Sequence, residues 1–252
     1  MIGIYDSGVG GLSVWKELKA QMPEKDYLYL ADNAHCPYGD KPIDYIIERA
    51  DKVSAYLMSQ GAKMVVVACN TATAAAINYL REKYPIPFVG MEPAVKPAAN
   101  ISRTGVVGVL ATANTFKGRL YRDTVMKYCS NIKVIEVIGK GLVEAVESGN
   151  SAKELLEKYI SEFNAANADV LVLGCTHFPF LTEQIVKLAP KGMTIINPAP
   201  AVAKQAKLLA SKIIFNGGKN IFYATADTKP IERIAKAICP TLGTDSFETI
   251  NI

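Results

Sequence analysis

The chain has 252 residues, of which 50% are hydrophobic, and its 28 basic and 24 acidic residues give a formal net charge of +4. This composition excludes a disordered chain, and the length is sufficient for two domains of ordinary size. The charges are spread along the sequence without the Lys/Arg block typical of nucleic-acid-binding arms, so we expect no nucleic-acid partner.

The sequence also lacks the patterns of export and of metal binding. It begins directly with a strand-like pattern, without the regions of a signal peptide, and no apolar run reaches membrane-spanning length. Neither a Cys-x-x-Cys pair nor a zinc-ligand spacing is present, which argues against a metal and a disulfide framework. We therefore expect a cytoplasmic protein without a membrane partner. The five cysteines are at positions 36, 69, 129, 175 and 239.

Apolar runs alternate with helical patterns in the first ninety residues, which is typical of a parallel α/β sheet. The predicted strands are 2–5, 27–31, 64–68 and 86–89, and the predicted helices are 12–22, 43–60 and 72–83.

The same rhythm restarts after residue 100. The second set of predicted strands is 105–110, 133–137, 170–173 and 194–197, and the predicted helices are 115–128, 140–148, 151–167 and 180–188. Cys175 follows Cys69 by 175 − 69 = 106 positions, and the strand starting at Val106 follows the one starting at Ile2 by 106 − 2 = 104 positions. These nearly equal offsets indicate duplication of a domain-sized unit.

The predicted fold is therefore α/β, with two pseudo-symmetric, doubly wound parallel-sheet domains that face each other across a cleft. A possible strand at 221–224 and a possible helix at 230–238 lie outside the duplication, and either half could hold them. We place residues 1–95 and 205–252 in the first domain and residues 96–204 in the second.

Two cysteines occupy equivalent positions in the two halves. Cys69 follows the apolar run 65–68, Cys175 follows the run 170–174, and each precedes a residue that can cap a helix, Asn70 or Thr176. Free cysteine usually behaves as a small buried hydrophobe. Ligands of open parallel sheets, however, bind beyond the carboxyl ends of strands, and a helix N-terminus lowers the pKa of a thiol. Two facing thiols would supply an acid and a base.

The turn after the first strand contains Asp6, Ser7 and three glycines, at positions 8, 10 and 11. Its spacing matches neither the dinucleotide fingerprint nor the nucleotide P-loop, so a small carboxylate ligand fits better than a nucleotide. The alternative is a plain tight turn, which would explain the glycines but not Asp6.

Other candidate residues lie at further strand ends. Backbone groups near Gly39, in the loop 32–39, are candidates to hold a carboxylate, whereas we interpret His35 and Cys36 as inert or packing residues. Thr112 and Thr115 provide hydroxyl groups for a ligand, although Thr115 alternatively caps a helix.

In the second half, Glu144 and Glu147 are three positions apart on one helical face, and the pattern does not decide which of them faces the cleft. His177, two positions after Cys175, has the chemistry to polarise or protonate nearby groups.

Five motifs together resemble the glutamate racemase family almost from end to end. They are Asp6–Gly11 (DSGVGG), Pro37–Gly39 (PYG), Cys69–Ala74 (CNTATA), Glu92–Ala98 (EPAVKPA) and Gly174–Pro179 (GCTHFP). The resemblance implies interconversion of L- and D-glutamate without pyridoxal phosphate or another cofactor, with D-glutamate supplied to peptidoglycan synthesis. It also implies a homodimer.

The resemblance also implies the residue roles. Cys69 would take the α-proton of D-glutamate with help from Asp6, and Cys175 would take that of L-glutamate with help from His177 and Glu147. The positions that match the family's substrate contacts are Ser7, Pro37, Tyr38, Gly39, Asn70, Thr71, Thr112, Thr115 and Thr176.

Two alternatives are distinguishable by experiment. The first is a racemase or isomerase of another acidic substrate such as aspartate, against which His177 weighs because we would expect Glu there. The second is a two-lobed small-molecule binding protein, in which paired thiols would have no role.

Overall fold

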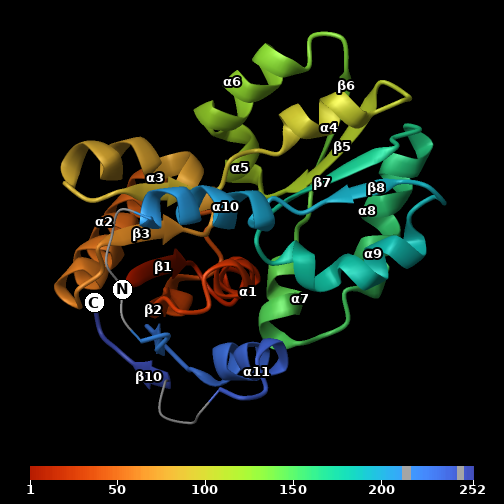
Figure 1. Ribbon diagram of the computed structural model, residues 1–252. Coiled ribbons are helices and arrows are strands. Elements are labelled where there is room, and N and C mark those ends of the chain that lie inside the picture. Colours follow the sequence, from red (N-terminus) through yellow and green to blue (C-terminus); the bar gives the residue numbers. More distant parts are fainter. Residues whose placement is uncertain (212–216, 243–246) are drawn as a thin grey trace.

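The computed structural model describes residues 1–211, 217–242 and 247–252, and these residues form two parallel sheets flanked by helices (Figure 1). The six-stranded sheet has the order β10-β9-β2-β1-β3-β4, and the four-stranded sheet has the order β6-β5-β7-β8. We call the part of the chain built on the first sheet the first lobe and the part built on the second sheet the second lobe. The predicted fold class is confirmed.

The first sheet takes strands from both ends of the chain. Its strands are β1 (Ile2–Asp6), β2 (Tyr27–Ala31), β3 (Met64–Val67), β4 (Phe88–Gly90), β9 (Asn220–Ala224) and β10 (Phe247–Thr249). The accompanying helices are α1 (Leu12–Gln21), the short 3₁₀ helix η1 (Asn33–His35), α2 (Ile43–Ser59), α3 (Asn70–Lys83), α10 (Ala199–Ala210) and α11 (Lys229–Ile238).

The second lobe is continuous in sequence. Its strands are β5 (Val106–Ala111), β6 (Lys133–Ile138), β7 (Val170–Gly174) and β8 (Thr194–Ile196). Its helices are α4 (Val95–Ile101), α5 (Ala113–Lys117), α6 (Arg119–Tyr128), α7 (Leu142–Ser148), α8 (Lys153–Ala165), η2 (Phe178–Leu181, a 3₁₀ helix) and α9 (Thr182–Leu188).

The central strands form because their sequences are apolar on both faces. Every residue of β1, β2, β3 and β7 is buried, as expected for parallel strands covered by helices on both sides. The edge strand β6 is largely exposed, so charged residues are tolerated there. The apolar runs of the sequence thus mark the centres of the two sheets.

Internal duplication is visible in the strand order. The order β2-β1-β3-β4 in the first sheet recurs as β6-β5-β7-β8 in the second. Cys69 follows β3 and Cys175 follows β7, so the two thiols come after equivalent strands. The pseudo-symmetry inferred from sequence offsets is confirmed.

Several elements differ from the expectations. The single helix expected over 115–128 is two helices, because Gly118 is extended and a Cβ there would lie 2.7 Å from Ala74 Cβ of α3. Helices α4 and α10 and strand β10 were not predicted. The proposed domain limits, 1–95 with 205–252 and 96–204, stay a prediction, which the distribution of strands between the sheets supports.

The C-terminal segment joins the first lobe through β9, which pairs with β2. Its Phe222 contacts Trp15 of α1 edge to face, with ring centroids 5.2 Å apart, and Trp15 Nε1 donates a hydrogen bond to Asn220 Oδ1 at 3.1 Å. Aromatic contacts of this kind add to the stabilisation from area burial. The open question of which half holds this segment is thereby answered.

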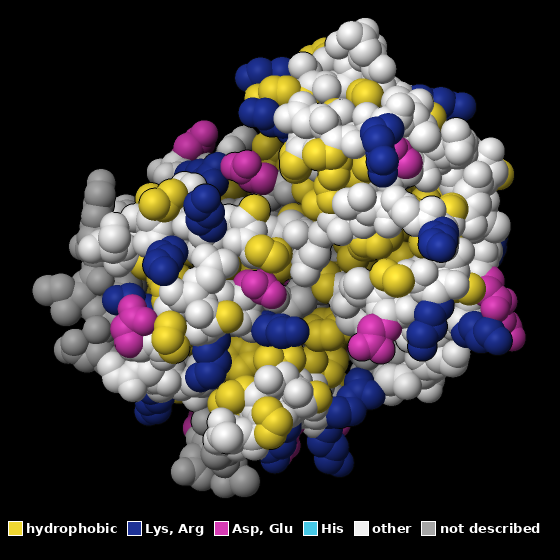
Figure 2. Space-filling model, turned by 45° about the vertical axis from the view of Figure 1, so that its right-hand side comes forward, with side chains coloured by type: hydrophobic (Ala, Val, Ile, Leu, Met, Phe, Trp, Pro, Cys, Tyr) yellow, Lys and Arg dark blue, Asp and Glu magenta, His cyan; other side chains and the backbone are white. Residues whose placement is uncertain are grey.

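Charges are mixed on the molecular surface. Figure 2 shows basic and acidic side chains interspersed over one face, without a continuous basic area among the described residues on it. Among the helices that the structure describes, none combines the length and the apolarity needed to cross a bilayer.

Candidate active site

The loops that follow β1, β3, β5 and β7 meet where the two lobes touch. Thr176 of the second lobe donates a hydrogen bond to Asp6 Oδ1 at 3.1 Å and accepts one on its carbonyl oxygen from Ser13 Oγ at 2.9 Å. The Thr71 and Thr112 hydroxyls are 2.9 Å apart. The carboxyl ends of parallel strands are the usual ligand-binding edge, so the fold gathers the candidate residues there.

Cys69 is the N-cap of α3 and is only 5% exposed. Its Sγ accepts a hydrogen bond from Ala72 N at 3.4 Å and lies 3.8 Å from Ser7 Oγ. Burial, followed by the negative charge of Asp6, raises the pKa of Cys69 to about 12. The hydrogen bond from Ala72 N at the helix N-terminus lowers this pKa as expected, but the expected net lowering is wrong, because the cost of burying a thiolate exceeds the stabilisation from the helix.

Cys175 has a different local structure. It is 6% exposed, and its Sγ lies 3.7 Å from His177 Nδ1. The chain after β7 forms the 3₁₀ helix η2 from Phe178, and the α-helix begins only at Thr182. The helix argument applied to Cys69 therefore does not carry over to Cys175, whose immediate partner is an imidazole.

His177 links Cys175 to Glu147. His177 Nε2 and Glu147 Oε1 are 2.6 Å apart, and the same oxygen accepts a hydrogen bond from Val9 N of the first lobe at 2.8 Å. Burial alone would lower the pKa of His177, but contacts with Cys175, Cys36 and the glutamate raise it well above its ordinary value. Burial likewise opposes ionisation of Glu147, yet its hydrogen bond with the histidine lowers the pKa.

The structure distinguishes between the two candidate carboxylates of α7. Glu147 faces His177, whereas Glu144 is exposed and lines a groove of about 290 Å³ together with Lys140. The geometry therefore favours Glu147 as the partner of the imidazole. Arg233 of α11 donates hydrogen bonds to the carbonyl oxygens of Val146 and Glu147, both at 3.1 Å, where the end of α7 meets α11 (Figure 1).

Asp6 is fully buried at the end of β1. Its carboxylate accepts hydrogen bonds from Gly8 N at 3.0 Å and from the Thr176 hydroxyl. Burial raises the pKa of Asp6, and the nearby His177 opposes that rise. A buried carboxylate with a raised pKa, close enough to affect the pKa of Cys69, is suited to exchange a proton with its surroundings.

Polar side chains beside the thiols offer groups to a small ligand. Thr112 is the N-cap of α5, and its hydroxyl lies 2.9 Å from that of Thr115 as well as from that of Thr71. Asn70 Oδ1 is buried and has no hydrogen-bond partner among the described residues. A buried unpaired acceptor is costly, so Asn70 is suited to accept a hydrogen bond from a ligand donor such as an ammonium group.

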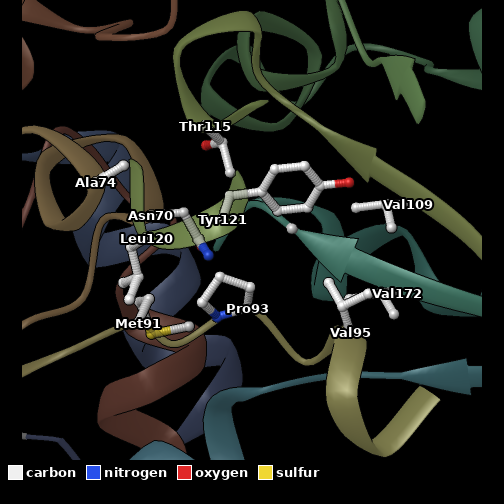
Figure 3. Close-up of a pocket in the computed structure, with 11 residues that line it drawn as sticks. Asn70, Ala74, Met91, Pro93, Val95, Val109, Thr115, Leu120, Tyr121 and Val172 are labelled. Atoms are coloured by element: carbon white, nitrogen blue, oxygen red, sulfur yellow. The ribbon is translucent and has the colours of Figure 1, made fainter. Parts of the chain in front are cut away.

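Asn70 also lines a water-sized cavity of about 20 Å³ between the lobes (Figure 3). The wall of this cavity combines the first-lobe residues Ala74 and Met91 with Thr115 and Tyr121 of the second. Asn70 and Gly174, which also line the cavity, are the sequence neighbours of Cys69 and Cys175, so this largely apolar cavity lies beside the two segments that carry the thiols.

The segment Pro37–Gly39 contacts the second lobe through its backbone. Asn114 Nδ2 donates to the Tyr38 carbonyl oxygen at 3.2 Å, and a Cβ at Gly39 would lie 3.2 Å from Thr112 Cβ. The Tyr38 hydroxyl instead donates to Asp32 Oδ2 at 2.5 Å. Any contact of this segment with a ligand is therefore made by main-chain groups or by Pro37.

Two features of the site escaped sequence reasoning. Cys36, interpreted as an inert or packing residue, places its Sγ 3.7 Å from Glu147 Oε1, while His35 contacts Tyr45 instead. The other feature is the buried pair of Asp32 and Arg49 beneath Tyr38. The sequence signal for this pair was Asp32, an acidic residue directly after the apolar run of β2.

Two buried thiols after equivalent strands, each beside its own acid–base partner, define a site for proton transfer. The chain belongs to the family described as Asp/Glu/hydantoin racemase, whose model matches residues 12–206. The glutamate racemase of Pseudomonas aeruginosa (strain PAO1) is 43% identical over 242 residues, which are 92% of this chain and 91% of that protein.

Solved structures agree with this assignment. Escherichia coli glutamate racemase in complex with L-glutamate and the activator UDP-MurNAc-Ala superposes with a TM-score of 0.89, at 29% identity, over 99% of this chain and 97% of that one. A glutamate racemase isoform of Bacillus anthracis gives a TM-score of 0.87 at 28% identity, over 100% and 97% of the two chains. The resemblance drawn from the five motifs is confirmed.

Proposed function

We propose that this protein interconverts L- and D-glutamate by proton transfer at Cα between two thiols. The observation that carries the proposal is the placement of Cys69 and Cys175 after the equivalent strands β3 and β7, both buried where the lobes touch. Inversion of Cα needs a base on one face and an acid on the other, and two such groups supply both. The relatives named above are glutamate racemases.

In the direction from D-glutamate, the Cys69 thiolate takes the α-proton and the Cys175 thiol donates its proton to the opposite face. The electron pair left on Cα forms the new C–H bond, so the product is L-glutamate. Asp6 relays the resting proton of Cys69 to solvent, and His177 with Glu147 restores the proton of Cys175. The reverse reaction exchanges the two thiols' roles.

Substrate binding uses the polar groups beside the thiols. Asn70 Oδ1 is the acceptor for the substrate ammonium, and the hydroxyls of Thr71 and Thr112 donate to its carboxylate groups. Because the site is buried, these groups act at low dielectric, where they stabilise developing charge more strongly than in water. Ser7, Thr115, Thr176 and the segment Pro37–Gly39 complete the proposed binding wall.

The biological setting follows from the same proposal. D-glutamate made in the cytoplasm would supply peptidoglycan synthesis, and the protein would act as a homodimer without a cofactor. A substrate panel tests the assignment: we expect metal-free, pyridoxal-free protein to racemise glutamate and to leave L-aspartate unchanged. Preferential turnover of aspartate would contradict the assignment, and full function in Cys69→Ala or Cys175→Ala would favour the binding-protein alternative.

The glycine turn predicts a sensitive position next to His177. A Cβ at Gly10 would lie 2.3 Å from His177 Nδ1 and 2.6 Å from Thr176 Oγ1, so Gly10→Ala must displace these side chains. We expect kcat to fall by about 100-fold, since a displacement of about 1 Å can have that effect. Steady-state kinetics would measure the fall.

Gly61→Ala is the control for this prediction. Gly61 has a positive φ but open space around it, so the variant should lose stability and keep its activity. Equal kinetics in Gly10→Ala and the wild type would contradict the placement of His177.

The raised pKa of Cys69 predicts the pH dependence. Because D-glutamate requires the Cys69 thiolate, and because the pKa of this thiol is raised to about 12, the thiolate fraction grows with pH throughout the neutral range. We expect kcat/KM for D-glutamate to rise between pH 7 and 9, by up to about tenfold per pH unit. Asp6→Asn removes a charge that raises this pKa, so the rise should move to lower pH. A pH-independent wild-type profile, or a shift to higher pH in Asp6→Asn, would contradict this assignment.

A further inference from the structure

Three potential metal ligands meet at the contact between the lobes. Cys36, Glu147 and His177 each place one ligand atom within 4.8 Å of the other two. Cys36 comes from the loop after η1 in the first lobe, whereas Glu147 lies in the last turn of α7 and His177 follows β7 in the second lobe. A single ion at this point would hold both lobes together.

Two of the three spacings between these atoms are within about 1 Å of those of a tetrahedral site, and the third, between Cys36 and His177, is below 4.8 Å. Zinc bonds of about 2.0–2.3 Å place neighbouring ligand atoms roughly 3.3–3.7 Å apart. Cys36 Sγ and Glu147 Oε1 are already 3.7 Å apart, and His177 Nε2 lies 2.6 Å from the same oxygen. The histidine–glutamate pair would have to open by less than about 1 Å. The ion would replace the thiol proton and the proton shared by this pair.

We propose that Cys36, Glu147 and His177 form a binding site for a zinc-like divalent cation that bridges the two lobes. A thiolate, an imidazole and a carboxylate together favour Zn²⁺ or Co²⁺ over Mg²⁺, which prefers oxygen ligands. Three protein ligands leave the fourth position to water, the coordination found in catalytic zinc sites.

The three ligands are too far apart in the sequence for the site to be recognised there. Cys36 and Glu147 are 111 positions apart, and Glu147 and His177 are 30 positions apart. In the zinc motifs that can be recognised from sequence, paired ligands are only a few residues apart. The expectation of no metal was based on such short spacings alone. The proposed site depends on contact between the two lobes instead.

Occupation of the site would stop racemisation. The ion takes the Glu147 carboxylate and the His177 imidazole, which are the groups proposed to restore the proton of Cys175. This consequence rests on the proposed function, whereas ion binding itself does not. A cation of this kind would therefore inhibit racemisation, because it would hold the lobes together and block proton transfer by Glu147 and His177.

Cobalt provides a direct test, because a cobalt–thiolate bond absorbs in the near ultraviolet. Titration of the metal-free full chain with Co²⁺ should give this band in the wild type and in Cys129→Ser. The double variant Cys69→Ser/Cys175→Ser should keep it, since neither thiol is a ligand. Cys36→Ser should lose the band and bind Co²⁺ more than about tenfold more weakly, because losing even an outer-shell partner typically costs 10–100-fold.

A second measurement covers the case in which Cys36→Ser folds poorly. Zn²⁺ should raise the Tm of the wild type and leave that of Glu147→Gln unchanged, while Mg²⁺ should shift neither. Persistence of the cobalt band in Cys36→Ser, its loss in the double variant, or its absence from the wild type would overturn the proposal. Failure of the racemisation assays would leave this test intact, because it measures ion binding alone.

Discussion

Replacing Cys69 or Cys175 with serine is expected to lower glutamate racemisation in both directions by about 10²- to 10⁴-fold, the contribution typical of a positioned acid or base. A serine hydroxyl is a much weaker acid than a thiol, so it neither accepts nor returns the α-proton at a useful rate. Because each turnover uses both groups, either substitution should suffice. Initial rates of D- and L-glutamate formation would measure the loss.

The two variants are further expected to differ in hydrogen exchange. In Cys175→Ser, Cys69 still removes the α-proton of D-glutamate and can return a deuteron to the same face. Exchange without inversion should therefore survive for D-glutamate in Cys175→Ser and for L-glutamate in Cys69→Ser. Cys129→Ser, which alters a buried cysteine of a separate cluster, is the matched control and should keep full activity. Full racemisation by either active-site variant would contradict the two-thiol account.

Arg49→Ala is expected to lower the free energy of unfolding by roughly 3–5 kcal/mol, the usual cost of leaving one partner of a buried ion pair unpaired. Asp32 is fully buried and accepts hydrogen bonds from Arg49 Nη2 at 2.7 Å and Nε at 2.9 Å. The same carboxylate also accepts the hydroxyl of Tyr38, which accepts a hydrogen bond from Tyr5. In a chain of this size the loss corresponds to a fall in Tm of roughly 10 °C.

Thermal unfolding of Arg49→Ala beside Tyr38→Phe would check this assignment. Tyr38→Phe removes two hydrogen bonds, the one to Asp32 and the one from Tyr5, but keeps the ion pair, so it should destabilise the protein by a smaller amount, about 1–3 kcal/mol. Activity should fall with stability in Arg49→Ala, because the network supports the segment Pro37–Gly39 that contacts the second lobe. An unchanged Tm in Arg49→Ala would show that water or another group replaces the guanidinium.

Much of the fold follows from local sequence because its strands are buried on both faces. The runs at 27–31 and 64–68 are apolar without interruption, and such runs identify central parallel strands within a residue or two. The nearly equal offsets between the halves showed that Cys175 is the counterpart of Cys69 before any tertiary contact was known. Periodicity did not reveal α10, whose first turn contains proline.

The site was less accessible to sequence reasoning because its properties depend on tertiary contacts. The helix start at Cys69 was visible in the sequence, but the burial that raises the pKa of this thiol was not. The choice between Glu144 and Glu147 depends on where α7 meets His177. Cys36 approaches Glu147 only because two loops from different lobes converge.

Incubation of metal-free, pyridoxal-free protein with L-glutamate in deuterated water tests the central claim most directly, with optical rotation and Cα deuterium followed together. The two-thiol account predicts that rotation decays to zero while one deuterium enters Cα of the product. Unchanged rotation without deuterium incorporation would contradict glutamate as the substrate. Loss of rotation without deuterium incorporation would contradict proton transfer between thiols that exchange with solvent.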